Sequence, residues 1–269
     1  MPDRYAVIGN PVAHSRSPWI HAQFARQTGQ DIEYARLEAP LGAFARTVEE
    51  FRAAGGRGAN VTLPFKEEAF RYCAQPSERA SAAQAVNTLI FEGVLARGDN
   101  TDGAGLVRDL TVNLRRRLAG ARVLLMGAGG AARGVLRPLL EAGAGRLTIA
   151  NRTVATAARL AARFPGFAVK ASPYEALVGQ VFDIIVNATS AGLGGEMPPL
   201  PAGIFAPGAL AYEMVYGRDT PFLALARAAG VEARDGAGML VEQAAESFFL
   251  WRGVRPDTRQ VLDVLQRGV

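Results

Sequence analysis

Short apolar runs alternate along this chain with stretches whose apolar residues recur every three or four positions. The runs predict strands, and the recurring pattern predicts helices. The second half is the clearest, because the runs Arg122–Met126 and Arg146–Ala150 are each followed by a helical stretch. Alternating strands and helices are typical of parallel sheets with helices on both faces. We therefore expect an α/β protein.

The remaining elements follow the same two patterns. Further strands are expected at Arg4–Gly9, Asp31–Glu38, Gly58–Thr62, Val181–Asn187 and Ala209–Val215, with a hairpin over Asn87–Arg97 that turns at Glu92–Gly93. Helices are expected at Ser17–Gln27 (with Ser17 as N-cap), Leu41–Ala54, 65–73, 77–85, from Thr153 onward and at Met239–Trp251. Leucines recur every four residues at Leu106, Leu110, Leu114 and Leu118, which predicts an amphipathic helix across a domain boundary.

Charge narrows the class of ligand. The 269 residues carry 30 Lys and Arg against 25 Asp and Glu, a net charge of +5. The longest basic run is Arg115–Arg117, with no aromatic residues interleaved. This composition argues against nucleic acid as a partner and favours a small anion. Lysine occurs only at Lys66 and Lys170, so nearly every cation is arginine.

The cysteine content and the chain start indicate a compartment. Cys73 is the one cysteine, which excludes an internal disulfide and suits a reducing compartment. Met1–Asn10 lacks the pattern of a signal peptide, and no apolar run approaches the length of a membrane span. We expect a cytoplasmic protein without a membrane partner.

A glycine-rich loop follows the strand Arg122–Met126. Its residues Gly127, Ala128, Gly129, Gly130, Ala131 and Ala132 match G-x-G-x-x-A between a strand and a helix, the context that a dinucleotide site requires. Gly127 permits the tight turn, Gly129 lets the backbone approach a pyrophosphate, and Ala132 permits close helix–strand packing. The alternative is an ordinary loop in a chain rich in glycine and alanine.

The second strand of this unit indicates which nicotinamide cofactor is bound. An NAD site usually has Asp or Glu here to bind the ribose 2′-hydroxyl. This chain has Asn151, Arg152 and Thr153, and a guanidinium beside a hydroxyl suits a 2′-phosphate that a carboxylate would repel. We therefore expect NADP rather than NAD.

Two polar turns carry candidate proton-transfer chemistry. The segment Asn60–Lys66 (NVTLPFK) ends a strand, and Asn100–Gly103 (NTDG) forms a second turn. Unlike arginine, a lysine can give up a proton and take it back, so Lys66 beside Asp102 would suit chemistry at a ketone or alcohol. A purely structural ion pair is an equally good interpretation of these two residues.

Taken together, these motifs resemble those of the shikimate dehydrogenase family. The matching segments span nearly the whole chain in family order: Ser15–Pro18, NVTLPFK at 60–66, Ala85–Thr88, Asn100–Gly103, GAGGAARG at 127–134, Asn151–Thr153, Asn187–Ser190 and DGAGMLVEQA at 235–244. The resemblance implies reversible NADPH-dependent reduction of 3-dehydroshikimate to shikimate, in aromatic amino acid biosynthesis. It also implies a substrate-binding α/β domain, residues 1–102 completed by 238–269, and an inserted Rossmann-type NADP domain with a parallel sheet, residues 103–237.

Site residues follow from the resemblance motif by motif. Lys66 and Asp102 match the catalytic pair; Ser15, Ser17, Thr62, Asn87, Tyr216 and Gln243 match substrate-binding positions; Gly127–Ala131, Asn151–Thr153, Met214 and Gly236 match NADP-binding positions. No metal site is expected, because no Cys, His and Asp cluster has metal-ligand spacing. The resemblance fits a monomer or a homodimer.

Simpler interpretations exist for several of these residues. Ser15 and Ser17 suit a turn and a helix cap as well as a bound carboxylate, and Asn87 suits a hairpin. Tyr216 and Met214 suit packing, Gly236 a turn, and Gln243 an exposed helix face.

Two activities remain as alternatives. One is a quinate/shikimate dehydrogenase, whose substrate carries an extra hydroxyl and which often accepts NAD; Arg152, Thr153 and the two serines favour the shikimate-specific form. The departure at Thr156, where the family often has a second arginine, weakens the expected preference for NADP. Two further positions depart from the family pattern. Gln84 replaces a glycine at a helix end, where we expect it to be tolerated, and Glu213 replaces an aspartate and retains its charge. A non-catalytic ligand sensor would be expected to lack Lys66 or Asp102, and both are present.

Overall fold

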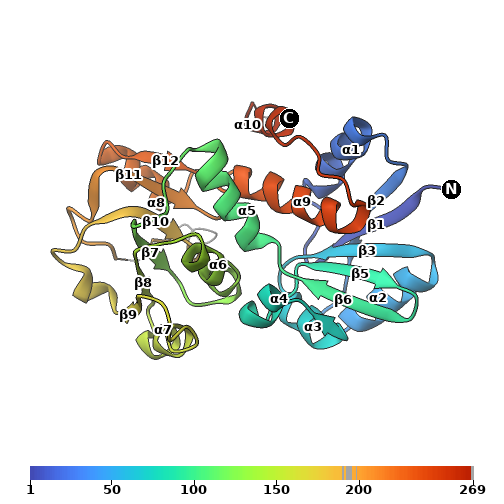
Figure 1. Ribbon diagram of the computed structural model, residues 1–269, viewed down its shortest axis with the longest axis horizontal. Coiled ribbons are helices and arrows are strands. Elements are labelled where there is room, and N and C mark those ends of the chain that lie inside the picture. The colour runs from blue at the N-terminus through green and yellow to red at the C-terminus, as the bar shows by residue number, and fades with distance from the viewer. Residues whose placement is uncertain (190, 192–195, 198, 268–269) are drawn as a thin grey trace. The chain divides into compact units, whose positions relative to one another are not determined.

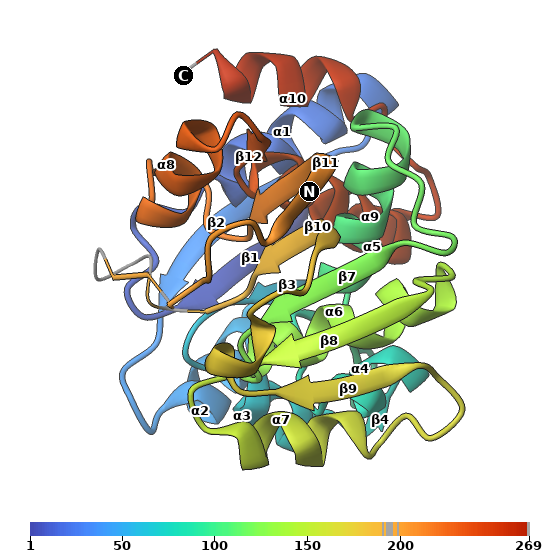
Figure 2. The same cartoon turned by 90° about the vertical axis from the view of Figure 1, so that its left-hand side faces the viewer.

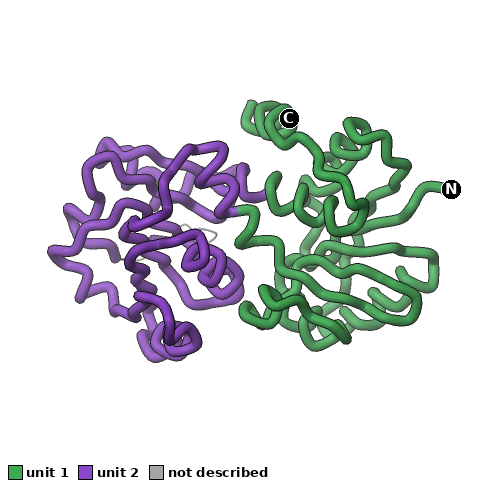
Figure 3. The backbone as a smooth tube through the Cα atoms, in the orientation of Figure 1, with its two compact units in different colours: residues 1–105, 241–269 green, residues 106–240 purple. Residues whose placement is uncertain are grey.

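The computed structural model describes residues 1–189, 191, 196–197 and 199–267, so Ser190 of the 187–190 motif lies outside the described residues. The chain forms two compact units (Figure 3). Unit 1 consists of Met1–Gly105 and Val241–Val269, and unit 2 of Leu106–Leu240. The chain leaves unit 1 within helix α5 (Asp102–Arg108) and returns within helix α9 (Ala237–Arg252).

Unit 1 is a mixed sheet with helices around it (Figure 1). Its strands are β1 Asp3–Gly9, β2 Ile32–Glu38, β3 Gly56–Val61, β4 Gln75–Pro76, β5 Thr88–Glu92 and β6 Leu95–Asp99. Its other helices are α1 Ser17–Thr28, α2 Phe44–Ala53, α3 Lys66–Tyr72, α4 Glu78–Ala83 and α10 Arg259–Gln266.

The register of the unit 1 sheet decides which polar turns meet. The described strands lie in the order β2-β1-β3-β5-β6-β4. β1 is parallel to β2 and β3, whereas β5 is antiparallel to β3 and β6. Asn60 near the end of β3 pairs with Thr88 at the start of β5, which pairs with Asp99 at the end of β6. The turns after β3, before β5 and after β6 therefore open at one edge of the sheet.

Two apolar layers stabilise unit 1. On one side, β1 and β3 pack against α2 and α3 through residues that include Ile8, Val48 and Phe65. The other layer is aromatic: the Trp251 ring of α9 stacks on Tyr5 at 4.6 Å, and His21 of α1 stacks on Tyr34 at 4.3 Å.

Unit 2 is a parallel α/β unit (Figure 2). Its elements are η1 Asp109–Asn113 (a π-helical turn), β7 Arg122–Met126, α6 Gly130–Glu141, β8 Arg146–Ala150, α7 Val154–Ala161, β9 Val169–Ser172, η2 Tyr174–Leu177 (a 3₁₀ turn), β10 Phe182–Asn187, β11 Phe205–Glu213, α8 Pro221–Ala228 and β12 Glu232–Arg234. The described strands run in the order β12-β11-β10-β7-β8-β9, and every pair is parallel. This all-parallel sheet confirms the expected fold class.

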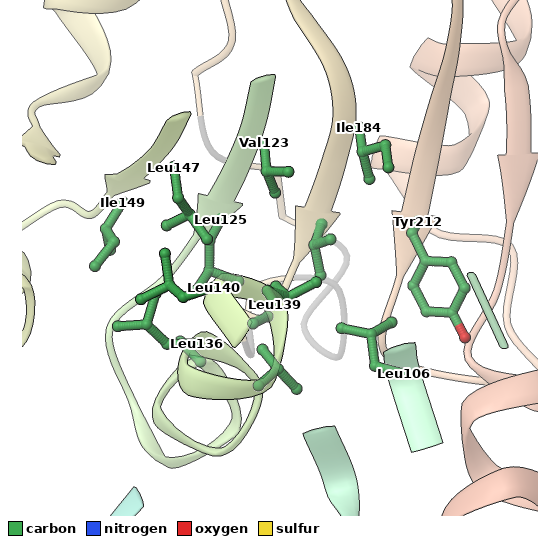
Figure 4. Packing of buried hydrophobic residues seen from close by; sticks show 14 of the residues in the cluster. Leu106, Val123, Leu125, Leu136, Leu139, Leu140, Leu147, Ile149, Ile184 and Tyr212 are labelled. Carbon is green, nitrogen blue, oxygen red and sulfur yellow. The ribbon is translucent and has the colours of Figure 1, made fainter. Parts of the chain in front are cut away.

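Buried aliphatic side chains fix α6 against this sheet (Figure 4). Leu136, Leu139 and Leu140 of the helix belong to the same buried cluster as Val123 and Leu125 of β7. These strand residues are buried because helices cover both faces of a parallel sheet, which explains their unbroken apolar run.

Most expected elements are present, and β7 and β8 have the predicted bounds. Two details were wrong. The helix through the repeated leucines ends at Asn113, and Arg115 then adopts a left-handed backbone (φ 52°), so Leu118 is buried outside any helix. Ser17 is not an N-cap: Arg16 holds that position without a side-chain cap.

Candidate active site

The loop after β3 places Lys66 at the edge of the unit 1 sheet where the parallel strands β1 and β3 end. The backbone N–H of Phe65 donates to the Thr62 carbonyl (3.0 Å), closing a turn from which α3 starts at Lys66. Gly9 of β1 permits this turn to pass close by, because a Cβ at that position would lie 2.4 Å from Thr62 Cγ2. Thr62 and Lys66 are both half-buried at this edge.

Lys66 and Asp102 form an ion pair at this edge. Lys66 Nζ donates to Asp102 Oδ2 at 2.6 Å, and the side chains are 21% and 8% exposed. Asp102 is the first residue of α5, where the free N–H groups of a helix favour a carboxylate. The sequence motifs predicted both residues, although they are 36 positions apart.

Asn87 holds the second oxygen of Asp102. Its Nδ2 donates to Asp102 Oδ1 at 2.8 Å, and its Oδ1 accepts from the Thr101 backbone N–H at 2.8 Å. Gln243 Oε1 lies 3.2 Å from the same amide nitrogen, which brings α9 to this cluster. Four predicted residues, Lys66, Asn87, Asp102 and Gln243, thus lie together, and Asp102 is held at both oxygens.

Beneath the cluster, Asn60 links the site to the aromatic layer. Its Nδ2 donates to the Asn87 carbonyl (3.2 Å) and to Ser247 Oγ (3.0 Å), while its Oδ1 accepts from the Tyr34 hydroxyl at 2.7 Å. Asn60 and Asn87 are buried. A buried polar network with these partners gives the site a single arrangement.

Ser15 and Ser17 form a separate pair of buried hydroxyls before α1. The Ser15 hydroxyl donates to Ser17 Oγ at 3.2 Å, and the Ser17 backbone N–H donates to Ser15 Oγ at 3.3 Å. Both residues are buried, and the first turn of α1 contains no acidic residue. Adjacent hydroxyls beside a helix N-terminus suit a carboxylate.

Tyr34 and Arg36 of β2 contact this pair, and the sequence analysis missed both. Arg36 donates from Nε (3.0 Å) and Nη2 (2.6 Å) to the Ser15 carbonyl. The Tyr34 hydroxyl donates to Asn60 Oδ1 at 2.7 Å; burial raises its pKa well above the usual value, and the nearby Ser17 hydroxyl offsets this only in part. The signal was the position of these two polar residues, two apart on one face of a strand.

His21 lies in the same layer as an uncharged group. Burial lowers the pKa of its imidazole to about 3, and a contact with Asn60 offsets this only in part. Its ring packs against Phe24, Tyr34 and Trp251, so it belongs to the core.

In unit 2 the glycine-rich loop joins β7 to α6. Gly127 has φ +100°, which glycine adopts readily, and a Cβ there would lie 3.1 Å from the Ala188 carbonyl oxygen. Gly129 precedes α6, whose N-terminus has no side-chain cap, and a Cβ on Gly129 would meet no atom within 4 Å. Open space beside free helix N–H groups fits a dinucleotide pyrophosphate.

The other predicted residues of this loop complete the turn. Ala128 is buried in the core of unit 2, and Gly130 and Ala131 form the first turn of α6. Ala132 is fully buried, as close packing between helix and strand requires.

The segment after β8 has exposed basic side chains and no acidic residue. Asn151 Nδ2 donates to the Thr153 carbonyl at 2.9 Å, and Arg152 and Thr153 are exposed just before α7. Arg159 of α7 donates to Thr156 Oγ1 at 3.2 Å, so a second guanidinium lies over the first turn of the helix. No Asp or Glu occurs between residues 141 and 175. Both features fit the 2′-phosphate of NADP rather than a free ribose hydroxyl.

Met214 and Gly236 lie against each other beyond β11. A Cβ on Gly236 would lie 2.3 Å from the Met214 carbonyl oxygen, so a larger residue would displace this backbone. The buried carboxylate of Glu213 accepts from Asn187 Nδ2 (2.7 Å) and the Val215 N–H (3.2 Å), and burial raises its pKa. Tyr216 follows, half-buried, in the same loop.

Neither a metal-ligand cluster nor a membrane-spanning helix occurs among the described residues. In that part of the chain, no three His, Cys, Asp or Glu side chains gather as a metal site would require. The helices described there include none that is both long and apolar enough to span a membrane.

Comparison with known proteins identifies the relatives of this chain. Three family models match: the shikimate dehydrogenase substrate binding domain over residues 7–89, shikimate / quinate 5-dehydrogenase over 109–193, and the shikimate 5′-dehydrogenase C-terminal domain over 236–266. The chain is 61% identical to the shikimate dehydrogenase (NADP(+)) of Aromatoleum aromaticum, with 98% of this chain and 97% of that relative covered.

Solved structures match over the same length. An Ael1 enzyme from Pseudomonas putida shares 51% identity at a TM-score of 0.93, covering 98% of each chain. The shikimate 5-dehydrogenase of Thermus thermophilus in complex with NADP(H) and shikimate shares 36% identity at a TM-score of 0.88, covering 99% of this chain and 100% of that one.

Proposed function

Because the chain belongs to the shikimate dehydrogenase family, we propose that it catalyses the reversible NADPH-dependent reduction of 3-dehydroshikimate to shikimate, with Lys66 and Asp102 as the proton-transfer pair. The observation that carries the assignment of residues is the 2.6 Å ion pair between them. It lies at the edge of a sheet that also presents Asn87 and Gln243.

The chemistry of the ion pair suits a ketone. In the reductive direction the Lys66 ammonium donates its proton to the C3 oxygen while the C3 carbon receives a hydride, which gives the alcohol. In the oxidative direction the neutral amine takes this proton back. Asp102 keeps Lys66 in place and accepts a hydrogen bond from a substrate hydroxyl, and Asn87 keeps the Asp102 carboxylate from turning.

The open space and free N–H groups at the loop after β7 support the proposed cofactor residues. Gly127–Ala131 with the N-terminus of α6 would hold the pyrophosphate, and Asn151–Thr153 would hold the 2′-phosphate. Met214 and Gly236 would lie at the nicotinamide. NADPH, when bound, supplies the hydride.

The substrate residues are proposed by the chemistry of each side chain. Ser15 and Ser17 would bind the carboxylate with Thr62 and Tyr216 nearby, and Asn87 and Gln243 would bind the ring hydroxyls. In this proposal residues 1–102 and 238–269 form the substrate domain and residues 103–237 the NADP domain. The partner is thus a small anion, and the single cysteine supports a reducing, cytoplasmic compartment.

Quinate/shikimate dehydrogenase activity is the second candidate, because one matching family model covers both substrates. Absorbance of the nicotinamide on mixing the protein with 3-dehydroshikimate and NADPH or NADH tests both activities, and the reverse reaction compares shikimate with quinate. Fast NADPH oxidation, slow NADH oxidation and no turnover of quinate support the first proposal. Comparable rates on quinate or with NADH favour the second. Absence of turnover with every pair of substrates contradicts both.

A further inference from the structure

Arg36 of β2 has no role in the reaction proposed above. Its guanidinium donates two hydrogen bonds to a single backbone oxygen, that of Ser15. In the part of the chain that the structure describes, no carboxylate lies within 4.0 Å of it, so its charge is not neutralised by an ion pair. The residue is exposed, so water solvates this charge, and the two bonds to Ser15 fix where the guanidinium lies.

The bonds from Arg36 fix the turn that presents the two buried hydroxyls. The Ser15 N–H donates to the Val12 carbonyl at 3.0 Å, and Arg36 donates to the Ser15 carbonyl at 2.6 Å. Ser17, two residues on, contacts the Tyr34 hydroxyl. Tyr34 and Arg36 are two apart on one strand, so they lie on the same face of β2, and Arg36 secures the turn through the Ser15 carbonyl.

Charge is the second part of the argument. Two serine hydroxyls are neutral, and removing a carboxylate from water onto neutral donors is costly unless a cation is near. The bond lengths of one residue place the Arg36 guanidinium within about 8 Å of the Ser15 hydroxyl oxygen. The N-terminus of α1, which begins at Ser17 without an acidic residue in its first turn, adds partial positive charge at the same point.

We propose that Arg36 is a positioning residue for the substrate carboxylate, which fixes the Ser15–Ser17 turn and supplies the charge that makes this turn select an anion. The proposal rests on the proposed function, since it assumes that Ser15 and Ser17 receive the carboxylate of shikimate. It predicts that Arg36 affects binding of the carboxylate much more than the chemical step.

The test compares an anionic and a neutral substrate. Wild-type protein is first assayed with shikimate and NADP; absence of turnover at this stage refutes the proposed function and not the role of Arg36. Arg36→Met is then assayed with shikimate and with its uncharged methyl ester. We expect the KM for shikimate to rise roughly 10-fold, a typical effect of one partly screened charge, while kcat and the KM for the ester stay within about threefold.

Two further variants keep the result interpretable. Arg36→Lys retains the charge but not the paired donors, so we expect a smaller rise in the KM for shikimate. Arg4→Met is the matched control, because Arg4 of the same sheet also donates to a loop carbonyl, that of Ala54 at 2.6 Å. It should leave the preference for shikimate over the ester unchanged. Equal changes for both substrates in Arg36→Met, or no change for either, would overturn the proposal.

Discussion

Acid should destabilise unit 1 through His21, a residue outside the proposed chemistry. The imidazole is fully buried among Phe24, Tyr34 and Trp251, and burial lowers its pKa from 6.5 to about 3. In the unfolded chain the same imidazole regains its ordinary pKa. Between these two values the unfolded state binds a proton that the folded state does not bind, so stability falls as the pH falls from about 6.5 toward 3.

The size of the effect follows from the two pKa values. Near pH 7.5 the imidazole is neutral in both states and contributes almost nothing to the pH dependence. Near pH 5 protonation of this imidazole stabilises the unfolded state by about 2 kcal/mol relative to the folded state, the free energy of protonating a group of pKa 6.5 at that pH. His21→Phe removes the titrating group from an aromatic layer that accepts another ring. The variant should therefore keep about 2 kcal/mol more of its stability on acidification than the wild type.

Tryptophan fluorescence during urea unfolding measures this difference. The chain has two tryptophans, Trp19 and Trp251, and both lie in unit 1. Other groups also titrate, but they contribute equally to the wild type and the variant and cancel in the difference. Phe24→Leu is the matched control: it perturbs the same layer and retains His21, so its pH dependence should follow the wild type. Equal losses of stability in the wild type and His21→Phe would refute the reasoning.

Three further predictions concern the two units. Asp102→Asn should lower kcat by about 100-fold or more, because the amide cannot balance the charge of Lys66; a kcat within threefold of wild type in steady-state assays would contradict this. Arg152→Gln should raise the KM for NADPH at least about 10-fold and leave the KM for NADH nearly unchanged, and equal effects on both cofactors would argue against a 2′-phosphate contact. Gly238→Ala should destabilise unit 2 by about 1–3 kcal/mol in urea unfolding followed by circular dichroism, because its Cβ would lie 2.0 Å from the buried Asp109 carboxylate; unchanged stability would show that this carboxylate moves freely.

The parallel unit could be predicted closely because its signals are local. β7 and β8 are apolar runs with both faces buried, and the glycine-rich loop follows directly from β7. The repeated leucines show the limit of this approach. Their period predicted burial correctly at Leu118, but the left-handed backbone at Arg115 ends the helical path before it.

The candidate site could be predicted only in part, because its side chains meet across long separations. Lys66 and Asp102 stood out as polar residues in turns, and the antiparallel register of β5 and β6 brings those turns to one edge. Tyr34 and Arg36 stood two apart on one strand face, but nothing in the sequence tied Arg36 to Ser15, which lies 21 residues away. Ser17 had the position of a helix cap, but its Oγ accepts from the Ser15 hydroxyl instead.

The most direct test of the central assignment compares the two lysines of the chain. Lys66 forms the ion pair with Asp102, whereas Lys170 lies exposed on β9 and donates to Gln180. The rate of NADPH oxidation with saturating 3-dehydroshikimate should fall by about 100-fold or more in Lys66→Ala, the size expected for loss of a general acid, and should stay at the wild-type value in Lys170→Ala. A Lys66→Ala variant that retains the wild-type rate would contradict the assignment of Lys66 as the proton donor.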